Sequence, residues 1–505
     1  MLIAASGQDP AGLAPDRLFA GIDFTTSPAV VVAVSGGGDS IALLHLLSRH
    51  LPRTRIVAVT VDHALRPGSA GEAQDVGAFC ATLGVRHLIR KWHGDKPATG
   101  LSAAARDARY RLLAEAADDV GATMLLTGHT EDDQAETVAM RATRGEGRGL
   151  AGMAPATLLD GRLWLVRPLL STRRAALRDY LRGNGIGWLD DPTNEDEAYE
   201  RVRVRRRLAD PAEFARAIET ARQGARERER LGEAAAALIA TCALPAPGLI
   251  RLAASAFLAA PRDAATYALR LLLATAGGGE HLPEEPRTAA LLDRFGEPAF
   301  RASLARTTVE RRGEAIFLYR EARGMPERGP AVDGQIWDGR FRLGNVEGET
   351  IGPAGRFAGR REDETSGVPP ALARATAAAR PALFRGAECL GVLDGHTDMD
   401  LPPPLTPPHK GEGDADASES PSPLWGGVRG WGGSYAEISE RSHAFNPGAS
   451  DMPPSPGRPF AVPVAAPFAR IMSAFDLAPA RALIKLAGGE LPPPPPYAGH
   501  TAPEA

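Results

Sequence analysis

A glycine-rich hexapeptide, Ser35-Gly36-Gly37-Gly38-Asp39-Ser40, has the residue types that bind phosphate groups. Three glycines let the backbone turn tightly with its N–H groups pointing inward, and a helix that starts here would add the positive end of its dipole. Ser35 and Ser40 can donate hydroxyl hydrogen bonds. Asp39 would repel phosphates unless it holds a Mg²⁺ ion that bridges them. The alternative is a glycine-rich turn whose Asp or Ser only caps the helix.

The elements around this loop are those of an α/β domain. Residues 29–34 are a continuous apolar, β-branched run, which is typical of a strand buried on both faces, and residues 41–47 have helical character. We predict further strands at 56–61, 87–89 and 123–127, and helices at 72–83, 101–117 and 132–144. This alternation predicts a Rossmann-like parallel sheet with helices on both faces. Open sheets of this kind bind nucleotides beyond the carboxyl ends of their strands.

The loop does not match the two common phosphate-binding fingerprints. No Gly-Lys-Ser/Thr follows it, as a Walker A site requires, and its spacing is not that of the GxGxxG dinucleotide motif. SGGGDS directly after VVVAV resembles instead the PP-loop of the N-type ATP pyrophosphatases. That resemblance implies that ATP is split into AMP and pyrophosphate when a substrate oxygen attacks the α-phosphorus.

Further motifs narrow the resemblance. They are VDHALRP at 61–67, AARDARY at 104–110, GHTEDDQAET at 128–137, RGEGRGLAGM at 144–153, RPLL at 167–170 and DPTN at 191–194. In order and spacing, from about residue 29 to residue 208, the set resembles the tRNA(Ile)-lysidine synthetase family.

The resemblance implies a tRNA-modifying ligase. Members of the family join free L-lysine to the wobble cytidine in the CAU anticodon of tRNA(Ile). ATP adenylates the carbonyl oxygen at position 2 of the base, and the ε-amine of lysine then displaces AMP. The expected cofactors are therefore ATP and Mg²⁺, with Asp39 as the metal ligand and Ser35 to Ser40 on the phosphates. The expected partners are tRNA(Ile) and L-lysine.

His129, Asp132 and Asp133 are the catalytic candidates besides Asp39. They follow a predicted strand and open a predicted helix, so one Asp can be an N-cap while the other complements the helix dipole. In the functional interpretation, one carboxylate takes a proton from the lysine amine, which must be neutral to attack. The other carboxylate could position Mg²⁺. We favour Asp133 as catalytic, and Glu136 could bond the helix start or an arginine.

Two pairs of residues are candidates for substrate contacts. Asp62 and His63 are expected to contact the adenosine of ATP, or else they only terminate a strand. Arg106 and Arg109 share one face of a helix, from which they could reach tRNA or bridge to carboxylates.

A dense basic run after the DPTN motif is expected to bind tRNA phosphates. Its alternating part, Arg201, Arg203 and Arg205, suits an extended strand or the start of a helix. The family usually has Asn after the first of these arginines, and Val202 stands there instead. Any role for an amide side chain at that position is therefore in doubt.

Composition agrees with this interpretation. The chain has 505 residues and a net charge of −4, so any nucleic-acid contact must come from a local basic patch. Its three cysteines form no CxxC pair, which argues against disulfides, zinc or an iron–sulfur cluster and fits the cytoplasm. We find neither a signal peptide nor a run of about 20 apolar residues, and expect no membrane association.

We predict five segments along the chain. They are a PP-loop domain at 1–208, a helical tRNA or substrate domain at 209–305, a small mixed α+β module at 306–400, a disordered Pro/Gly-rich insertion at 401–460, and a short helix with a flexible C-terminus at 461–505. A chain that ends near residue 400 should then stay soluble. The sequence leaves the oligomeric state open, a homodimer included.

Two other functions compete with that of a lysidine synthetase. Another PP-loop enzyme, such as a tRNA cytidine thiolase, would need cysteines as sulfur carriers or cluster ligands, and GMP or asparagine synthetase would bring an amidotransferase domain with a nucleophilic cysteine. A tRNA-binding homologue without catalysis would not need the intact SGGGDS and EDDQAET motifs.

Overall fold

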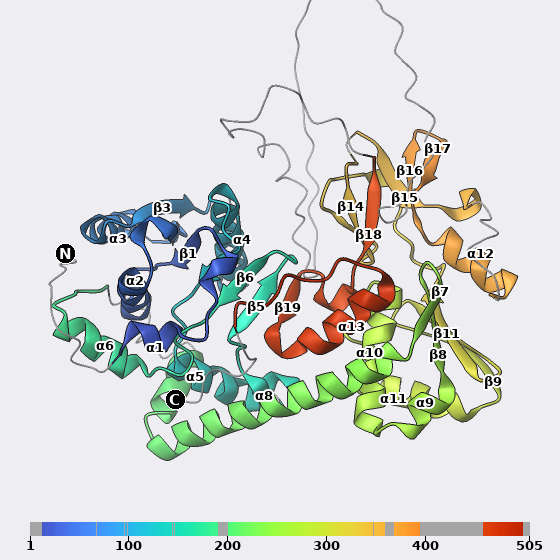
Figure 1. Cartoon of the computed structure of the whole chain (residues 1–505), viewed down its shortest axis with the longest axis horizontal. Helices are drawn as coiled ribbons and strands as arrows, with labels where there is room; N and C mark the ends of the chain where they lie inside the picture. The colour runs from blue at the N-terminus through green and yellow to red at the C-terminus, as the bar shows by residue number, and fades with distance from the viewer. Residues whose placement is uncertain are drawn as a thin grey trace, which may run out of the picture.

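A seven-stranded sheet forms the centre of the first part of the computed structural model (Figure 1). The structure describes residues 13–66, 68–94, 96–97, 99–143, 145, 147–189, 200–346, 348–358, 368–393 and 458–497. The strand order is β19-β5-β6-β4-β1-β2-β3. The strands are β1 (Val30–Ala33), β2 (Ile56–Asp62), β3 (Arg86–Lys91), β4 (Met124–Leu126), β5 (Ala156–Leu159), β6 (Leu163–Val166) and β19 (Ile471–Ser473).

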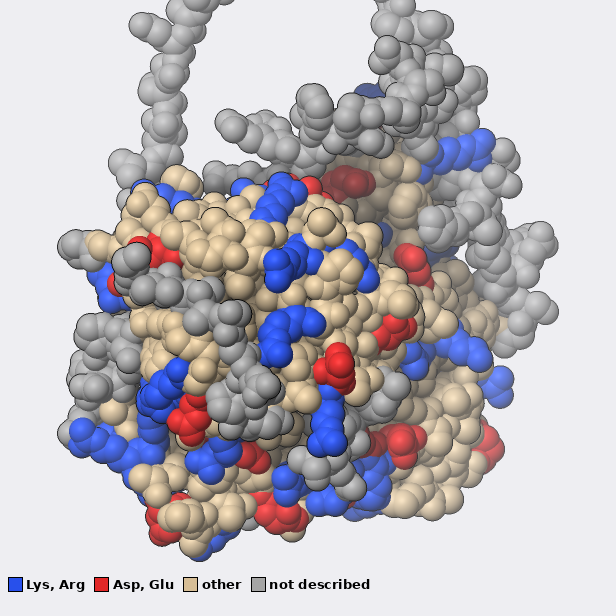
Figure 2. Space-filling model, turned by 60° about the vertical axis from the view of Figure 1, so that its left-hand side comes forward, with Lys and Arg blue, Asp and Glu red and all other residues tan. Residues whose placement is uncertain are grey.

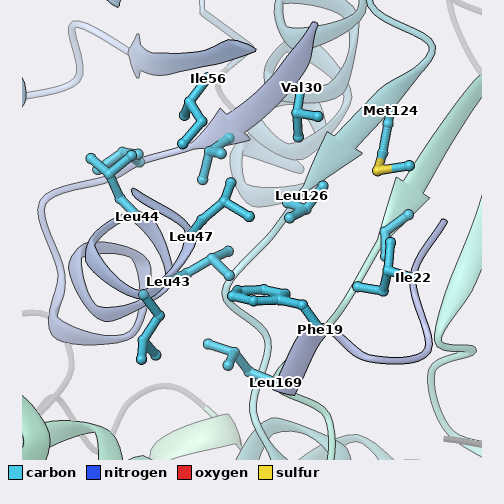
Figure 3. Close-up of a cluster of buried hydrophobic side chains, with 14 of the residues drawn as sticks. Phe19, Ile22, Val30, Leu43, Leu44, Leu47, Ile56, Met124, Leu126 and Leu169 are labelled. Atoms are coloured by element: carbon cyan, nitrogen blue, oxygen red, sulfur yellow. The ribbon is translucent and has the colours of Figure 1, made fainter. Parts of the chain in front are cut away.

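Strand β1 lies between β2 and β4 and runs parallel to both, as the sequence predicted. Val30 and Val32 join the core on one face, and Val31 joins a separate core on the other. Figure 3 shows the first core, to which Val30 of the sheet and Leu43, Leu44 and Leu47 of α2 (Gly38–His50) all contribute. The chain thus needs apolar residues at every position of β1, which explains its unbroken valine run.

Helices cover both faces of the sheet. The face shown in Figure 3 packs against α1 (Pro15–Phe19), α2, α3 (Ser69–Leu83) and α6 (Arg174–Gly183). The opposite face packs against α4 (Leu101–Asp119). Because β2 and β4 flank β1 on opposite sides, the loops that follow β1 and β4 open side by side at the carboxyl edge.

A helical layer follows the sheet. Helix α5 (Glu131–Ala142), α7 (Glu200–Arg207) and α8 (Pro211–Ala240) share a small apolar core. The basic run is therefore helical, with Val202 and Val204 buried on its inner face. Figure 1 shows α8 as one long helix that runs from the first domain to the second.

The second domain contains more strand than predicted. A five-stranded sheet has the order β7-β8-β11-β10-β9, with α9 (Ala254–Ala259), α10 (Arg262–Gly277) and α11 (Glu285–Asp293) against it. Its strands are β7 (Ala243–Ala246), β8 (Leu249–Ala253), β9 (Ala299–Leu304), β10 (Thr307–Arg312) and β11 (Ala315–Arg320). The predicted boundary between residues 305 and 306 is wrong, since it cuts the β9–β10 hairpin.

Two small sheets follow in the third module. One has the order β12-β15-β16-β17 and the other β13-β14-β18. The strands are β12 (Gly329–Pro330), β13 (Ile336–Trp337), β14 (Phe341–Gly344), β15 (Thr350–Pro353), β16 (Pro381–Arg385), β17 (Glu388–Val392) and β18 (Phe460–Pro463), with α12 (Pro370–Ala378) beside them. The third module thus combines strands with a helix, and one of its strands, β18, arrives from beyond residue 458.

The described part of the segment at 461–505 contains a short helix, as expected, but it is not a flexible end, because it packs against earlier parts of the chain. Strand β19 pairs antiparallel with β5, and α13 (Leu477–Ala487) packs along α8. Met472 and Phe475 enter the core of the first domain, whereas Leu483 enters that of the second. Short apolar pieces of this kind carry little local signal, because their partners lie some 300 residues away in the chain.

Some predictions fall outside the described residues. They concern the DPTN motif at 191–194 and residues 401–457 of the insertion predicted at 401–460, whose last residue instead begins strand β18. Across the described residues, no helix combines the length and the apolar character needed to cross a bilayer.

The packing of the last segment predicts that truncation after residue 400 destroys the fold. It would remove Met472, Phe475, Leu477 and Leu483 from two cores. Loss of each of these buried side chains costs about 2–5 kcal/mol. Together the losses are as large as the roughly 5–15 kcal/mol that stabilises a typical domain.

Thermal unfolding followed by circular dichroism tests this expectation, which replaces that of a soluble truncated chain. The matched control is an internal deletion of residues 401–450, which removes none of the described contacts. A truncated chain that melts cooperatively at the wild-type temperature would contradict the prediction.

Candidate active site

The glycine-rich loop between β1 and α2 is held in shape by its own serines. The Ser40 hydroxyl donates to the carbonyl of Gly37 at 2.9 Å and accepts from the Ser35 N–H at 3.2 Å. Gly37 is the N-cap of α2, so the first N–H groups of that helix face the loop. Gly36 has φ +89°, and a Cβ there would lie 2.7 Å from Leu189 Cδ1. Ser40 therefore shapes the loop, and its bond to phosphate remains a prediction.

A second glycine brings the loop after β4 against this one. A Cβ on Gly128 would lie 3.0 Å from the backbone carbon and oxygen of Asp39. The chain next enters α5 through a capping box. In that box the Thr130 N–H donates to Asp133 Oδ2 at 2.9 Å, and the Asp133 N–H donates to Thr130 Oγ1 at 3.4 Å. Gly128 thus allows the approach that places the start of α5 beside Asp39.

Asp39 and Asp133 meet on one guanidinium group, that of Arg174 at the start of α6. Arg174 Nε donates to Asp39 Oδ2 at 3.0 Å, and Nη2 donates to Asp133 Oδ1 at 2.9 Å. All three side chains are largely buried. The structure therefore brings two of the predicted acidic residues together at the carboxyl edge of β1 and β4.

Glu136 lies deeper and is almost fully buried, with 1% of its side chain exposed. It accepts from Arg174 Nη1 at 3.4 Å, Arg201 Nε at 2.6 Å and Arg205 Nε at 2.7 Å. Arg201 also donates to Asp133 Oδ1 at 2.9 Å. Of the two roles considered for Glu136, the structure thus shows the arginine contact. It also shows that Arg201 and Arg205 neutralise buried carboxylates, while their contact with tRNA remains a prediction.

Asp132 has a different position from Asp133. Its Oδ2 accepts the backbone N–H of Arg174 at 2.7 Å, at the first residue of α6, and the side chain of Arg173 at 3.3 Å. Arg173 also stacks on the ring of Phe214, 3.7 Å from its centre. Asp132 therefore tethers the start of α6, whereas Asp133 faces the glycine-rich loop.

The two central carboxyls differ in their acidity. Burial raises the pKa of Asp39 above its ordinary value, although Arg174 opposes the shift. Burial also acts to raise the pKa of Asp133, but Arg174 and Arg201 outweigh it and hold that pKa below its ordinary value. Asp133 is therefore firmly ionised while both arginines stay in place.

His129 lies just before the capping box, and its Nδ1 is 2.9 Å from Thr127 Oγ1. Burial lowers the pKa of His129 to about 3, and the nearby Arg167 reinforces the shift. The imidazole is consequently neutral at physiological pH. His129 follows β4 at the same sheet edge as the glycine-rich loop, and a catalytic role for it remains a prediction.

Asp62 and His63 end β2 at the same sheet edge. Asp62 Oδ1 accepts the Ala64 N–H at 2.8 Å and the Ser69 hydroxyl at 2.7 Å, so Asp62 fixes the turn after the strand. His63 stands edge-on to the ring of Trp92, and its buried Nδ1 has no hydrogen-bond partner within the described residues. A contact with the adenosine of ATP remains a prediction for both.

Arg106 and Arg109 share one face of α4, as their spacing predicted. Their guanidinium groups lie 5.1 and 5.3 Å from the centre of the Tyr110 ring. Figure 2 shows Lys and Arg side chains in several separate groups on one side of the molecule, with acidic side chains beside some of them. Contact of Arg106, Arg109 and Arg203 with tRNA is still a prediction.

Arg173 and Arg174 were not predicted from the sequence. They follow the RPLL motif in the stretch Ser171-Thr172-Arg173-Arg174, and neither was singled out. The sequence did indicate that some arginine or lysine must lie there, because three acidic residues predicted at one sheet edge require a buried cation. Only the fold shows which of the many arginines supplies it.

Comparison with known proteins agrees with this geometry. Residues 16–212 match the PP-loop domain family. The first part of the chain is therefore a PP-loop domain, the class of nucleotide-binding domain that the loop and sheet define.

Relatives of the whole chain narrow the class further. A tRNA(Ile)-lysidine synthase of Mesorhizobium japonicum is 46% identical over 96% of this chain and 98% of its own length. The same enzyme of Rhizobium meliloti is 43% identical over 63% of this chain and 74% of its own length. This chain belongs to the tRNA(Ile)-lysidine synthase family, a family of ligases. A solved U34-tRNA thiolase of Methanococcus maripaludis is 16% identical, covers 42% of this chain and 77% of its own, and has a TM-score of 0.36.

The environment of Glu136 predicts a large stability effect of its charge. In Glu136→Gln, three arginines would lose the carboxylate that they share, and we expect a loss of about 3 kcal/mol in the free energy of unfolding. Urea unfolding measures the change. The matched control is Glu213→Gln, which breaks an exposed pair with Arg216 and should cost less than about 1 kcal/mol. Equal losses in the two variants would contradict the prediction.

The low pKa of His129 predicts acid sensitivity. The unfolded chain protonates this histidine near pH 6.5, but the folded chain does so only near pH 3. Stability from the neutral ring is therefore fully present above pH 6.5 and is lost as the pH falls toward 3, by up to about 1.4 kcal/mol per pH unit.

Unfolding free energies measured against pH test this sign. Between pH 6.5 and 4, the free energy of unfolding should change less steeply with pH in His129→Gln than in the wild type. His45→Gln provides a comparison, since burial lowers the pKa of His45 to about 4 and the affected range should be shorter. A slope in His129→Gln identical to that of the wild type would rule the prediction out.

Proposed function

We propose that this chain uses ATP and Mg²⁺ to ligate L-lysine to the wobble cytidine in the CAU anticodon of tRNA(Ile). The lysidine synthase of Mesorhizobium japonicum, which it resembles along almost the whole length of that enzyme, supports this assignment. The observation that carries it is the meeting of Asp39 and Asp133 on Arg174 beside the glycine-rich loop. ATP and tRNA are both found in the cytoplasm, which we propose as the compartment.

The loop supplies the phosphate site. The N–H groups at the start of α2 and the positive end of its dipole face the phosphates of ATP, with Gly36 to Gly38 allowing the backbone to come close. Asp62 and His63, at the end of the neighbouring strand, face the nucleoside side of the same edge. The nucleotide thus lies across the carboxyl ends of β1 and β2.

The residues present suit Mg²⁺. This ion is usually held by one or two carboxylates and by phosphate oxygens, not by a closed cage of protein ligands. Asp39, the second residue of α2, supplies one such carboxylate beside the glycine-rich loop, and no cluster of three metal-ligating side chains occurs among the described residues. When bound, Mg²⁺ would neutralise charge on the phosphates, and Asp39 would hold it.

Asp133 is our choice for the proton acceptor. Asp132 is committed to the start of α6, whereas Asp133 faces the loop. A carboxylate that is paired with Arg174 and Arg201 is a weak base. These ion pairs must therefore weaken before Asp133 can take a proton from the lysine amine. Phosphate and RNA oxygens offer them alternative partners. Arg106, Arg109, Arg201, Arg203 and Arg205 are the proposed tRNA contacts.

The test is an assay with the purified full chain, Mg·ATP, radiolabelled lysine and an isoleucine tRNA with a CAU anticodon. Asp39→Ala and Asp133→Asn should each reduce lysine incorporation by about 10²-fold or more, because each removes a charge at the reacting centre. The choice of Asn at 133 retains an acceptor for the capping box, which limits the loss of stability.

Two controls make the result specific. Glu219→Gln changes an exposed carboxylate on α8 and should leave the rate unchanged. Pyrophosphate release is followed alongside, so that release without lysine incorporation points to another nucleophile. If the wild type forms neither product, the chain binds tRNA without catalysis and the proposal fails.

A further inference from the structure

A buried carboxylate ties the end of the chain to the catalytic domain. Asp476 closes a short 3-10 turn (Ala474–Asp476) between β19 and α13 and is only 3% exposed. It accepts from Arg148, and Arg228 of α8 binds both of its oxygens, with Nε at 3.0 Å from Oδ1. Arg148 also lies 4.1 Å from the centre of the Tyr267 ring on α10. Three segments from distant parts of the sequence therefore meet at one carboxylate, and Arg148 adds a contact with a fourth, α10.

The first route from Asp476 to the acidic cluster runs through Arg148. This residue opens a short turn (Arg148–Ala151) within the glycine-rich RGEGRGLAGM motif. The turn leads to Met153, whose N–H donates to Gln134 Oε1 at 2.7 Å and whose carbonyl accepts from Gln134 Nε2 at 2.9 Å. Gln134 is the neighbour of Asp133 on α5. The position of Arg148 thus affects the position of Gln134 on α5, which is the residue next to Asp133 of the acidic cluster.

The second route runs along α8. Its backbone approaches the same turn so closely that a Cβ on Gly224 would lie 2.7 Å from the Ala151 nitrogen. Four residues further along α8, Arg228 forms an ion pair with Asp476. Toward its start, Phe214, Ala217 and Ile218 of α8 pack against α5 and α7, the helices that carry Glu136 and its arginines. A helix fixed at Asp476 therefore also fixes the support of the acidic cluster.

We propose that Asp476 is a positioning residue for the reaction, which sets the 148–151 turn and α8, and through them the start of α5. The inference rests on the proposed function for its assay. It makes the segment after residue 458 a working part of the catalytic domain and not a terminal appendage. Neither Arg148 nor Asp476 contacts the loop at residues 35–40, so the nucleotide site itself should be unaffected.

The experiment compares Asp476→Asn with a matched variant, Asp338→Asn, in the full chain. Asp338 is equally buried and is also surrounded by arginines, with Arg340 Nε at 2.7 Å and Arg320 Nε at 3.0 Å, but it joins the second domain to the third module. Both substitutions remove one buried negative charge. Melting temperature, kcat for lysine incorporation, and KM for ATP are measured for each.

Asp476→Asn should lower kcat by about ten- to a hundredfold, as misplacement of reacting groups does, with the KM for ATP within about twofold of the wild type. Asp338→Asn should retain its kcat at a similar melting temperature. Asp476→Glu should restore part of the rate. Arg148→Gln breaks only the first of the two routes, so it should lower kcat in the same direction as Asp476→Asn but no further. The double variant should be no slower than Asp476→Asn alone, since Asp476→Asn already removes the ion pair with Arg148.

A wild-type kcat in Asp476→Asn, or the same loss of kcat in Asp338→Asn, would overturn the inference. Independent, multiplying effects of Arg148→Gln and Asp476→Asn would overturn it as well. If the wild type incorporates no lysine, the proposed function fails separately. The same variants are then compared in tRNA-dependent pyrophosphate release, where a loss confined to Asp476→Asn and Arg148→Gln supports positioning and equal rates contradict it.

Discussion

Carboxylates that leave water must find cations, and this requirement organises the catalytic domain. Asp39, Asp133 and Glu136 come together because β1 and β4 are neighbours, and their charges could not remain buried alone. Arg174 serves all three, and α7 brings further arginines to Glu136. The positions of α6 and α7 are therefore set by the charges that they neutralise, in addition to the apolar surface that they cover.

The same arrangement recurs where parts of the molecule join. Asp476 unites the last segment with α8 and the first domain, and Asp338 unites the second domain with the third module. A buried pair of this kind adds little net stability compared with apolar packing, but it is strongly directional and costly to break. At these junctions it therefore fixes orientation, while the apolar cores supply most of the favourable energy.

Sequence patterns correctly predicted those parts of the structure that a few neighbouring residues specify. The valine run of β1, the glycines of the loop and the polar start of α5 each carry their own signal, because one strand, one turn and one cap are specified within a few residues. Arg174, β19 and the β9–β10 hairpin were missed or misplaced. Their roles depend on partners far away in the chain, such as Asp39 for Arg174 and β5 for β19. The Arg-Val alternation at 201–205 was ambiguous for a related reason, since only packing against α5 shows that its valines face inward from a helix.

The arginine network also implies an order of events at the site. With Arg174 and Arg201 in place, Asp133 is ionised but weakly basic, whereas burial keeps Asp39 less acidic than usual. Phosphates entering the loop would compete for Arg174, and a cation at Asp39 would replace the guanidinium that now compensates its charge. Release of Arg174 would remove one of the two arginines that lower the pKa of Asp133, and this loss acts to raise that pKa. In the proposed reaction, a nucleotide that arrives first would thus prepare the carboxylate for the amine that attacks second, and adenylation followed by ligation requires this order.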